Sequence, residues 1–589
     1  MANEEQLAIL KQGVESWNKW RAENPEVRID LRKASLSKSN LRGADLHESV
    51  LRGADLAEAD LTRANLYKAN LGEANLHGAS LDANLAEAYL FGATLTEANL
   101  SSANLYQADL SSADLRAANL SGANLVGAKL IGANFHQADL TAANLVETNL
   151  HQADLSEAKL NLIRLQGGYL VQANISGANL TGGFCNAANF THSDLSGANL
   201  RGADLSHATL SGANLTQADL SGEETSLWNI VCDGTNFKGA NLSRAKLYGA
   251  IISQGSDLSG TETNLSYSDL MGAYLCGSKF NGTNLREANL QKANLSDELG
   301  PVDLSSADLG GANLYLTNLT GANLHGANLA GAFLEQANLR GASLAQADLR
   351  AANLRGATLV RTVVDGAKLS GSSVYGISVW DLQGEFEEQK DLVITPENIS
   401  MIRVDNIKVA QFIYLILNNE ELRDTINTLT SKSVLILGRF AIPERKAILD
   451  ALKNKLREYN LLPIVFDFER PDDKDFTETI KTLAGLCYFV IADVTNPKSS
   501  PLELQATVPD YQIPFVPIIQ KGERPFAMMV DLQKKYNWVL ETRTYSSKEA
   551  LIKALKKGII EPAMQKHNEL RRIKAQKPDS ISLDDIGDE

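Results

Sequence analysis

The residues best suited to do chemistry lie in the last third of the chain, and they are carboxylates. Asp467 and Asp493 lie at the ends of two apolar runs, and Glu503 follows soon after the second. Histidine is absent between residues 385 and 560, and the only cysteine there, Cys487, begins an apolar run. Ser-His-Asp and Cys-His nucleophiles need an imidazole base, so we do not expect them in this domain. Any catalysis here would depend on carboxylates.

Alternating strands and helices would position these carboxylates. Continuous β-branched runs separated by helical patterns are typical of a parallel sheet covered on both faces. The order predicts a five-stranded doubly wound α/β domain of the flavodoxin type, in which functional residues follow the carboxyl ends of the strands. We expect strands at 433–437, 462–468, 487–494, 514–519 and 538–540, and helices at 443–459, 474–485, 501–508 and 547–558.

A pocket is therefore expected where these strands end. Gly438, Arg439 and Phe440 follow the first strand, and Asp467 and Asp493 lie at the ends of the second and third. We assign these five residues to the pocket. Neither G-x-G-x-x-G nor G-x-x-x-x-G-K-[ST] occurs there, so the pocket is not expected to contain an ordinary dinucleotide or nucleotide-phosphate loop.

The stretch at 492–519 resembles the corresponding region of Toll/interleukin-1 receptor (TIR) domains and of nucleoside deoxyribosyltransferases. In both families a glutamate after the third strand serves at an N-glycosidic bond, and Glu503 is the matching position. The resemblance implies a TIR-like hydrolase acting on NAD or a nucleoside, with NAD as substrate and no bound cofactor. A carboxylate suits this reaction because its transition state resembles an oxocarbenium ion. Ser500 and Pro501 replace the Trp-Cys pair that often precedes the TIR glutamate, and we favour a non-catalytic signalling or docking module.

A repeat of five residues dominates the preceding part of the chain. From Leu31 to about Val379 the pattern A-[DN]-L-x-x recurs almost without variation, as in ADLHE, ANLYK and ADLRA. On an α-helix this period would spread the leucines around the axis, and on a flat strand it would send alternate leucines to opposite faces. The chain must turn once per repeat, so that each leucine and the alanine two positions earlier point inward. The pattern predicts a β-solenoid with coils about 4.8 Å apart.

This pattern resembles that of the pentapeptide-repeat family. The resemblance implies an all-β right-handed quadrilateral β-helix, with four repeats per coil, over residues 31–384. A narrow interior of this kind explains why only 6% of the residues are aromatic. We expect a charge at Leu110 or Leu200 to be severely destabilising, because nothing inside could pair with it.

The longest interruption of the repeat lies at 221–236. Two successive matches to the motif are 17 residues apart here, which is not a multiple of five. The segment contains Trp228 and the acids Glu223 and Glu224. We favour a bulged corner that is tolerated on the surface. The alternative is that the segment projects as a partner-binding loop, since an exposed tryptophan is a suitable anchor for a partner.

Residues 1–30 are expected to cap one end of the solenoid, because the open end of stacked strands is an aggregation hazard. Asn3 with Gln6 fits an N-cap pair, and apolar residues follow at helical spacing as far as Trp17. The pattern predicts one amphipathic capping helix over residues 3–20.

The remaining segments have simpler expectations. We expect residues 385–432 to form a connector, with helices near 406–417 and 420–429. The α/β domain is expected to cover 433–560. The tail at 561–589 is basic and then acidic with little apolar content, so we expect it to be flexible.

The charge limits the classes of partner. The net charge is −15, and residues 31–380 contribute 23 Lys and Arg against 32 Asp and Glu. A basic groove for nucleic acid is therefore not expected. Some pentapeptide-repeat proteins imitate duplex DNA and inhibit type II topoisomerases, which is a further alternative. This solenoid would carry its charge far more sparsely than DNA, which has one charge per roughly 1.7 Å.

The four cysteines form no CxxC pair, so neither a disulfide scaffold nor a metal site is expected, and a reducing compartment is the natural location. The first residues lack a basic segment, and the apolar runs are too short to cross a bilayer. We expect a cytoplasmic interaction protein without membrane contact, in which the solenoid presents the TIR-like module to protein partners. The C-terminal domain is also a candidate for self-association.

Overall fold

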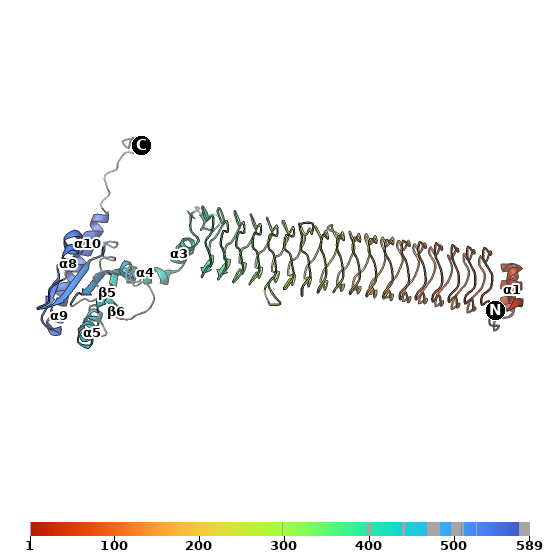
Figure 1. Ribbon diagram of the computed structural model, residues 1–589, viewed down its shortest axis with the longest axis horizontal. Coiled ribbons are helices and arrows are strands. Elements are labelled where there is room, and N and C mark those ends of the chain that lie inside the picture. Colours follow the sequence, from red (N-terminus) through yellow and green to blue (C-terminus); the bar gives the residue numbers. More distant parts are fainter. Residues whose placement is uncertain are drawn as a thin grey trace, which may run out of the picture. The chain divides into compact units, whose positions relative to one another are not determined.

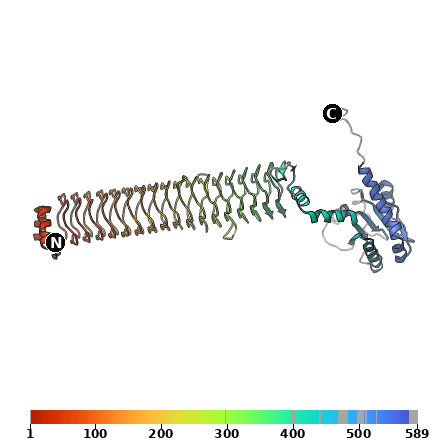
Figure 2. The same cartoon turned by 180° about the vertical axis from the view of Figure 1, so that it is seen from behind.

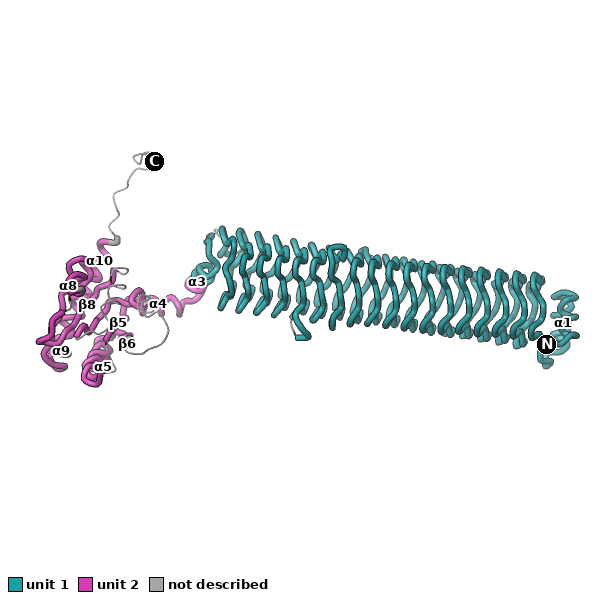
Figure 3. The backbone as a smooth tube through the Cα atoms, viewed as in Figure 1, with its two compact units in different colours: residues 1–414 teal, residues 415–589 magenta. Residues whose placement is uncertain are grey.

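The computed structural model describes residues 2–296, 298–396, 402–438, 442–467, 483–495, 508, 512–525 and 527–575. The chain divides into two compact units, residues 1–414 and 415–589 (Figure 3). The division lies inside helix α3 (Ile407–Asn418), within the segment expected to be a connector. None of the described helices is long and apolar enough to cross a bilayer.

Unit 1 is a β-helix with four repeats of five residues in each coil, as the resemblance implies. Each repeat closes a tight turn in which the alanine N–H donates to the preceding central carbonyl, as from Ala34 to Leu31 at 3.0 Å. The coils are joined by parallel β-bridges, and Asp30 pairs with Val50 exactly one coil of 20 residues later. The second residue after each central one has a positive φ, such as 68° at Gly43. The turn therefore favours glycine there.

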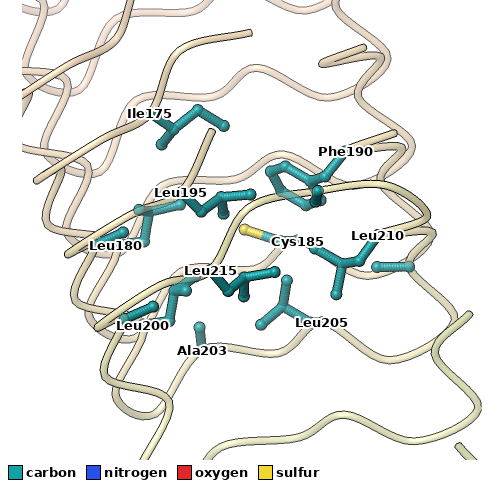
Figure 4. Close-up of a cluster of buried hydrophobic side chains, with 14 of the residues drawn as sticks. Ile175, Leu180, Cys185, Phe190, Leu195, Leu200, Ala203, Leu205, Leu210 and Leu215 are labelled. Carbon is teal, nitrogen blue, oxygen red and sulfur yellow. The ribbon is translucent and has the colours of Figure 1, made fainter. Parts of the chain in front are cut away.

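The interior of unit 1 is a continuous ladder of aliphatic side chains. Figure 4 shows central residues of successive coils stacked inside the helix, among them Leu180, Leu200 and Cys185. Alanine occupies the inner position two residues earlier, and both positions are fully buried along most of the unit. Phenylalanine fills the central position at a few coils, as at Phe135 and Phe190. This packing gives the low aromatic content a physical cause.

Two short helices cover the first coil (Figures 1 and 2). The single helix expected over 3–20 is wrong, because α1 (Glu4–Lys11) and α2 (Val14–Glu23) are separated at Gly13, where φ is 124°. The Asn3 side chain caps α1 as expected, accepting from the Gln6 N–H at 3.1 Å. The Gln6 side chain itself bonds to the backbone of residues 28 and 30, at the open edge of the β-helix.

The other end of the β-helix is covered too, which the sequence did not indicate. The last coils contain β1 (Thr358–Val360) and β2 (Ser378–Trp380), and β3 (Leu392–Val393) pairs antiparallel with β4 (Arg403–Val404). Ile407 and Ala410 of α3 are buried against the last coil. The Tyr414 ring meets Tyr375 edge to face, with centroids 4.9 Å apart. The Gln411 side chain accepts a hydrogen bond from the Val379 N–H at 3.3 Å.

The break at 221–236 is smaller than expected. The irregularity is confined to 221–225, where the chain contains two residues more than a regular repeat. Regular bridges resume at Ser226. Leu227 and Cys232 are buried at central positions, and Ile230 takes the inner alanine position. The segment therefore does not project as a whole, and the favoured bulged corner is confined to 221–225. Two ordinary repeats were not recognised here, because Ile230 replaces the alanine of the motif and Cys232 replaces its leucine. The interior accepts both side chains.

Unit 2 contains a five-stranded parallel sheet with helices on both faces. Its strands are β5 (Ser433–Gly438), β6 (Leu462–Asp467), β7 (Phe489–Asp493), β8 (Phe515–Gln520) and β9 (Arg543–Tyr545). Their order is β6-β5-β7-β8-β9, the order of flavodoxin-like doubly wound sheets. The fifth strand was expected at 538–540, but only Val539 forms a bridge there, with Phe515. The edge strand is instead β9, which is too short and polar to be recognised from an apolar run in the sequence.

Helices of unit 2 pack against alternate residues of β5. Val434 and Ile436 face α5 (Pro443–Glu458) and α9 (Lys548–Leu555), whereas Leu435 and Leu437 face α8 (Ala527–Lys535). Alternation along a strand thus places both faces of the sheet in a core. The helix α4 (Glu420–Lys432) leads directly into β5, as the connector pattern predicts. The helix expected at 501–508 lies almost wholly outside the described residues, as does most of that expected at 474–485.

The flexible tail was expected to begin at residue 561, but residues 561–575 form a helix. A π-helical turn at Lys556–Ile560 leads into α10 (Glu561–Ala575), and the residues after 575 are outside the described ones. Pro562 explains the wide turn, since its ring would clash with a carbonyl one turn earlier in a regular α-helix. Ala563 and Leu570 are buried, so α10 is amphipathic despite its many charges. The many charged residues of α10 made this narrow apolar face hard to recognise in the sequence.

Candidate functional site

The outer surface of unit 1 carries a column of large side chains. Trp228, Tyr248 and Met271 each follow the central residue in three successive coils. The Asn229 N–H donates to the Tyr248 carbonyl at 3.1 Å, and the Gly249 N–H donates to the Met271 carbonyl at 3.0 Å, so these coils stack in register. Trp228 and Tyr248 are 48% and 44% exposed. We call Trp228, Tyr248 and Met271 the aromatic patch.

The two-residue insertion lies one turn before this patch. It is held in place by Thr225, which is fully buried and whose hydroxyl accepts from the Gly202 N–H at 2.8 Å. Glu223 and Glu224 are exposed, and Glu223 forms an ion pair with Arg244 at 3.0 Å. The structure thus brings the expected acids and Trp228 to the surface, but on a pinned corner and a regular coil.

A second candidate lies at the carboxyl edge of the sheet in unit 2. Gly438 pairs with Asp467 at the ends of β5 and β6, and Asp493 ends β7 on the other side of β5. The chain passes from β5 to β6 on one side and from β7 to β8 on the other, and ligands bind at such a reversal of strand order in open α/β sheets. Arg439, Phe440 and Glu503 are outside the described residues, so three expected site residues have no structural account.

A network of polar side chains surrounds Asp493. Its carboxylate accepts from the Thr495 hydroxyl at 2.6 Å and lies 3.7 Å from the Arg445 guanidinium. Arg445, in the first turn of α5, also donates to the Tyr545 hydroxyl and to the Gln520 side-chain oxygen, both at 2.7 Å. Four segments that are distant in sequence therefore meet at the carboxyl edge. Arg445 is the common partner of this network.

Burial decides the electrostatics of this network. It raises the pKa of the Asp493 carboxyl above its usual value, more than the hydrogen bond from Thr495 and the charge of Arg445 lower it. Burial also raises the pKa of Tyr545, and the nearby Asp493 charge adds to that increase. The carboxyl of Asp493 can thus retain a proton at a higher pH than an exposed aspartate would. Such a group can act as a proton donor or as a neutral hydrogen-bonding partner.

A histidine joins the domain at the opposite edge of the sheet, which corrects the expectation that His567 belongs to a tail. Its ring lies 4.3 Å from the Tyr488 ring, and its Nδ1 is 3.1 Å from the Tyr488 carbonyl oxygen. His567 and Cys487 line one cavity of about 380 Å³. Burial raises the pKa of the Cys487 thiol to about 12, so this cysteine remains protonated and is a poor nucleophile.

Sequence comparison identifies the fold of unit 1. A family model described as pentapeptide repeats matches the chain in overlapping segments between residues 27 and 371, which together cover more than half of it. The chain belongs to the pentapeptide-repeat family. Members of this family are generally scaffold or interaction proteins. No curated protein matches the chain.

Several solved pentapeptide-repeat proteins resemble parts of the chain. HetL from Nostoc sp. strain PCC 7120, which is involved in heterocyst differentiation regulation, is 31% identical over 46% of this chain and 88% of its own, with a TM-score of 0.13. A protein of the Arabidopsis thaliana thylakoid lumen is 25% identical over 26% of this chain and 70% of its own (TM-score 0.13). Full-length QnrB1, a plasmid-mediated fluoroquinolone resistance protein, is 22% identical over 29% of this chain and 89% of its own (TM-score 0.17).

The sequence did not identify Arg445 at the carboxyl edge of the sheet, nor Tyr248 and Met271 in the aromatic patch. Arg445 was assigned only to a helix, although a cation in the first turn after a strand is a signal for the carboxyl edge. Tyr248 and Met271 occupy positions that the repeat leaves variable, so the motif does not single them out. Trp228 and Tyr248 lie one regular coil of 20 residues apart, but Met271 follows Tyr248 by 23 residues, because three residues are added in the coil between them.

Proposed function

We propose that this pentapeptide-repeat protein is an interaction scaffold, whose β-helix binds a protein partner through the aromatic patch. The observation that carries the proposal is the exposure of Trp228 and Tyr248 on successive, rigidly stacked coils. Large aromatic side chains are enriched at protein interfaces and among the residues that dominate binding energy. A scaffold that is already ordered also loses little conformational entropy when it binds.

In this proposal unit 2 serves as a TIR-like signalling or docking module attached to the scaffold. The flavodoxin-like strand order and the polar carboxyl edge are compatible with that role. The insertion with Glu223 and Glu224 would flank the bound partner, because both acids are exposed one turn before Trp228.

The test compares capture by two double variants of the full chain. Trp228→Ala with Tyr248→Ala removes the patch, whereas Trp380→Ala with Tyr169→Ala removes rings of similar exposure elsewhere. Proteins retained by the immobilised wild type are quantified by mass spectrometry. The proposal requires a partner that the control variant retains and the patch variant loses. Identical sets and amounts on both variants would contradict it.

A second candidate function for unit 2 is cleavage of an N-glycosidic bond in NAD or a nucleoside. The buried network at Asp493 favours it, since a carboxyl with a raised pKa beside a guanidinium is typical of catalytic pockets. Glu503 would be the catalytic carboxylate, and Gly438, Asp467 and Asp493 would line the pocket.

This candidate predicts slow release of nicotinamide from NAD, measured by chromatography. The assay uses the full chain at low and high concentration, because self-association through unit 2 would be needed if active modules assemble. Glu503→Ala should abolish turnover, and Glu541→Ala, whose side chain is 91% exposed, should leave it unchanged. An absence of turnover in every assembly state, with NAD and with nucleosides, would exclude the hydrolase.

A further inference from the structure

A shallow groove of about 430 Å³ lies on the surface of unit 1, beginning one coil beyond the aromatic patch, where Gln291 follows Met271 in the same column. It spans four successive coils, which is roughly 14 Å along the axis. Two rings and two carboxylates line it, together with amide side chains: Glu287, Tyr315, Phe333, Glu335, Asn313 and Asn353. Phe333 is 53% exposed, one of the most exposed large apolar residues that the structure describes.

The groove exists because side chains are missing at one corner of the β-helix. This corner carries Arg244, Tyr267 and Glu287 in three successive coils, and then Gly311 and Gly331 in the next two. A Cβ at Gly311 would lie 3.1 Å from Cγ of Glu287, so even an alanine would crowd the groove. The two glycines leave the rings of the adjoining side uncovered.

The groove offers groups that suit a cation. An aromatic face attracts a guanidinium or ammonium ion through its negative quadrupole, and a carboxylate pairs with the same ion directly. One oxygen of Glu335 accepts from the Asn353 amide at 3.2 Å, and a carboxylate has room for further donors. Glu287 accepts from the Tyr267 hydroxyl at 3.4 Å and has Arg286 at 3.9 Å, so its carboxylate is held at the edge of the groove.

The same corner already contains an arginine on an aromatic ring. The Arg244 guanidinium carbon lies 5.3 Å from the centroid of Tyr267, and the Tyr267 hydroxyl bonds to Glu287 in the following coil. Arginine, ring and carboxylate thus succeed one another along this column. The groove repeats the ring and the carboxylate one step further on, without an arginine in the corner beside them.

We propose that this groove binds an arginine side chain presented by a basic segment of a partner protein. Charge complementarity selects this occupant, since two carboxylates line the groove and the surrounding repeat region has a net negative charge. Arginine is favoured over lysine because its planar guanidinium stacks on a ring while donating to a carboxylate in the plane. The inference rests on the proposed binding role and adds the chemistry of one contact.

The test is a titration of the full chain with the peptide Ac-Gly-Arg-Gly-NH2, followed by NMR at about 0.15 M salt, where long-range attraction is screened. The citrulline analogue has the same shape without the charge. We expect saturable binding of the arginine peptide and binding of the citrulline peptide that is weaker by roughly tenfold. Equal binding of the two peptides, or no saturable binding of either, would overturn the proposal.

Variants then locate the site. Phe333→Ala leaves the charge unchanged, so it separates the groove from general attraction to an acidic protein. It should weaken arginine binding by roughly threefold to tenfold, and Glu335→Gln by a similar factor. Phe184→Ala is the matched control, because Phe184 is 47% exposed at the equivalent position of the same side, several coils away. An equal loss in the Phe184 variant would overturn the assignment.

The outcome is independent of the partner capture described above. If the patch variant still captures every partner while the peptide titration succeeds, the proposed role of the aromatic patch fails and the groove stands. If the titration fails while the patch variant loses its partner, the groove alone is rejected.

Discussion

The side-chain amide of Asn18 pairs with the backbone of Asp45 as a strand would. Its Oδ1 accepts from the Asp45 N–H at 2.8 Å, and its Nδ2 donates to the Gly43 carbonyl at 2.9 Å. The neighbouring indole of Trp17 is fully buried and donates to the Asp45 carbonyl at 2.8 Å. Helix α2 therefore satisfies backbone groups of the first coil that would otherwise be available for pairing with another chain.

Replacing this amide should weaken the cap. Asn18→Leu preserves the size of the side chain but leaves a buried N–H and a carbonyl without partners, at a cost of about 1–3 kcal/mol for each group. We expect a lower unfolding midpoint and new self-association, measured by thermal denaturation and analytical ultracentrifugation. Lys19→Leu adds the same apolar group at an exposed neighbouring position and should change neither. Equal behaviour of the two variants would contradict this role of α2.

A charge inside the β-helix should disrupt it. Leu110 is fully buried at a central position, whereas Ser112 is exposed on the same turn. Leu110→Asp would lose the buried side chain, which alone costs about 2–5 kcal/mol, and would add an unpaired charge. Chemical denaturation should show severe destabilisation or no folded protein. Ser112→Asp should remain close to wild type, and a similar loss there would show that the effect is not one of burial.

The cysteines should be unreactive in the folded protein. All four are buried, and burial raises the pKa of Cys185 and Cys487 to about 12 and that of Cys232 as well. Because the thiolate is the reactive form, labelling with a chromogenic disulfide at pH 8 should be very slow. Denaturant should release four equivalents at once. Fast labelling of one cysteine in the native protein would show that its coil or strand opens locally.

The raised pKa of Asp493 predicts a pH-dependent stability of unit 2. Above the unfolded value of 3.8, and up to the higher folded pKa, the folded state keeps a proton that the unfolded state has released. The contribution of Asp493 therefore falls as the pH rises through this window. Hydrogen exchange of β5 and β7, compared between wild type and Asp493→Asn, isolates the effect. The wild type should lose protection relative to the variant as the pH rises, and a relative gain would contradict the sign.

Arg445 and Asp493 should also be coupled energetically. Arg445→Met would leave the buried carboxylate without its cation, and removing one partner of a buried pair costs about 3–5 kcal/mol. The Asp493→Asn change should cost much less in that background than in the wild type. A double-mutant cycle on the same hydrogen-exchange readout measures this difference. Additive effects would show that the two side chains do not depend on each other.

The sequence was most informative where one rule repeats. The period of five is incompatible with a helix or a flat strand, so a chain such as Leu31 to Val379 allows one architecture. Local irregularities were less legible, because a position such as Cys232 is decided by available volume and not by residue type. The pairing of Asn18 with Asp45 depends on where two short helices dock, and no local pattern encodes that.

The sheet of unit 2 was predictable from local sequence patterns, whereas its candidate site was not. Buried strands such as β5 and β7 have continuous apolar runs, and their order follows from general rules of winding. The network at Asp493 joins residues from α5, β8 and β9, and only their spatial convergence shows that Arg445 matters. The short edge strand β9 and the amphipathic α10 were concealed by polar composition.

The 20-residue spacing of the β-bridges has a consequence for how this protein can change in length. Duplicating or deleting one whole coil would move everything beyond it along the axis by a fixed step, and each residue would stay on the same side of its coil. The corner at 221–225 shows the complementary case, since two added residues are absorbed locally and the next bridges resume. Insertions and deletions of whole coils would therefore change the distance between two surface features in steps of one coil.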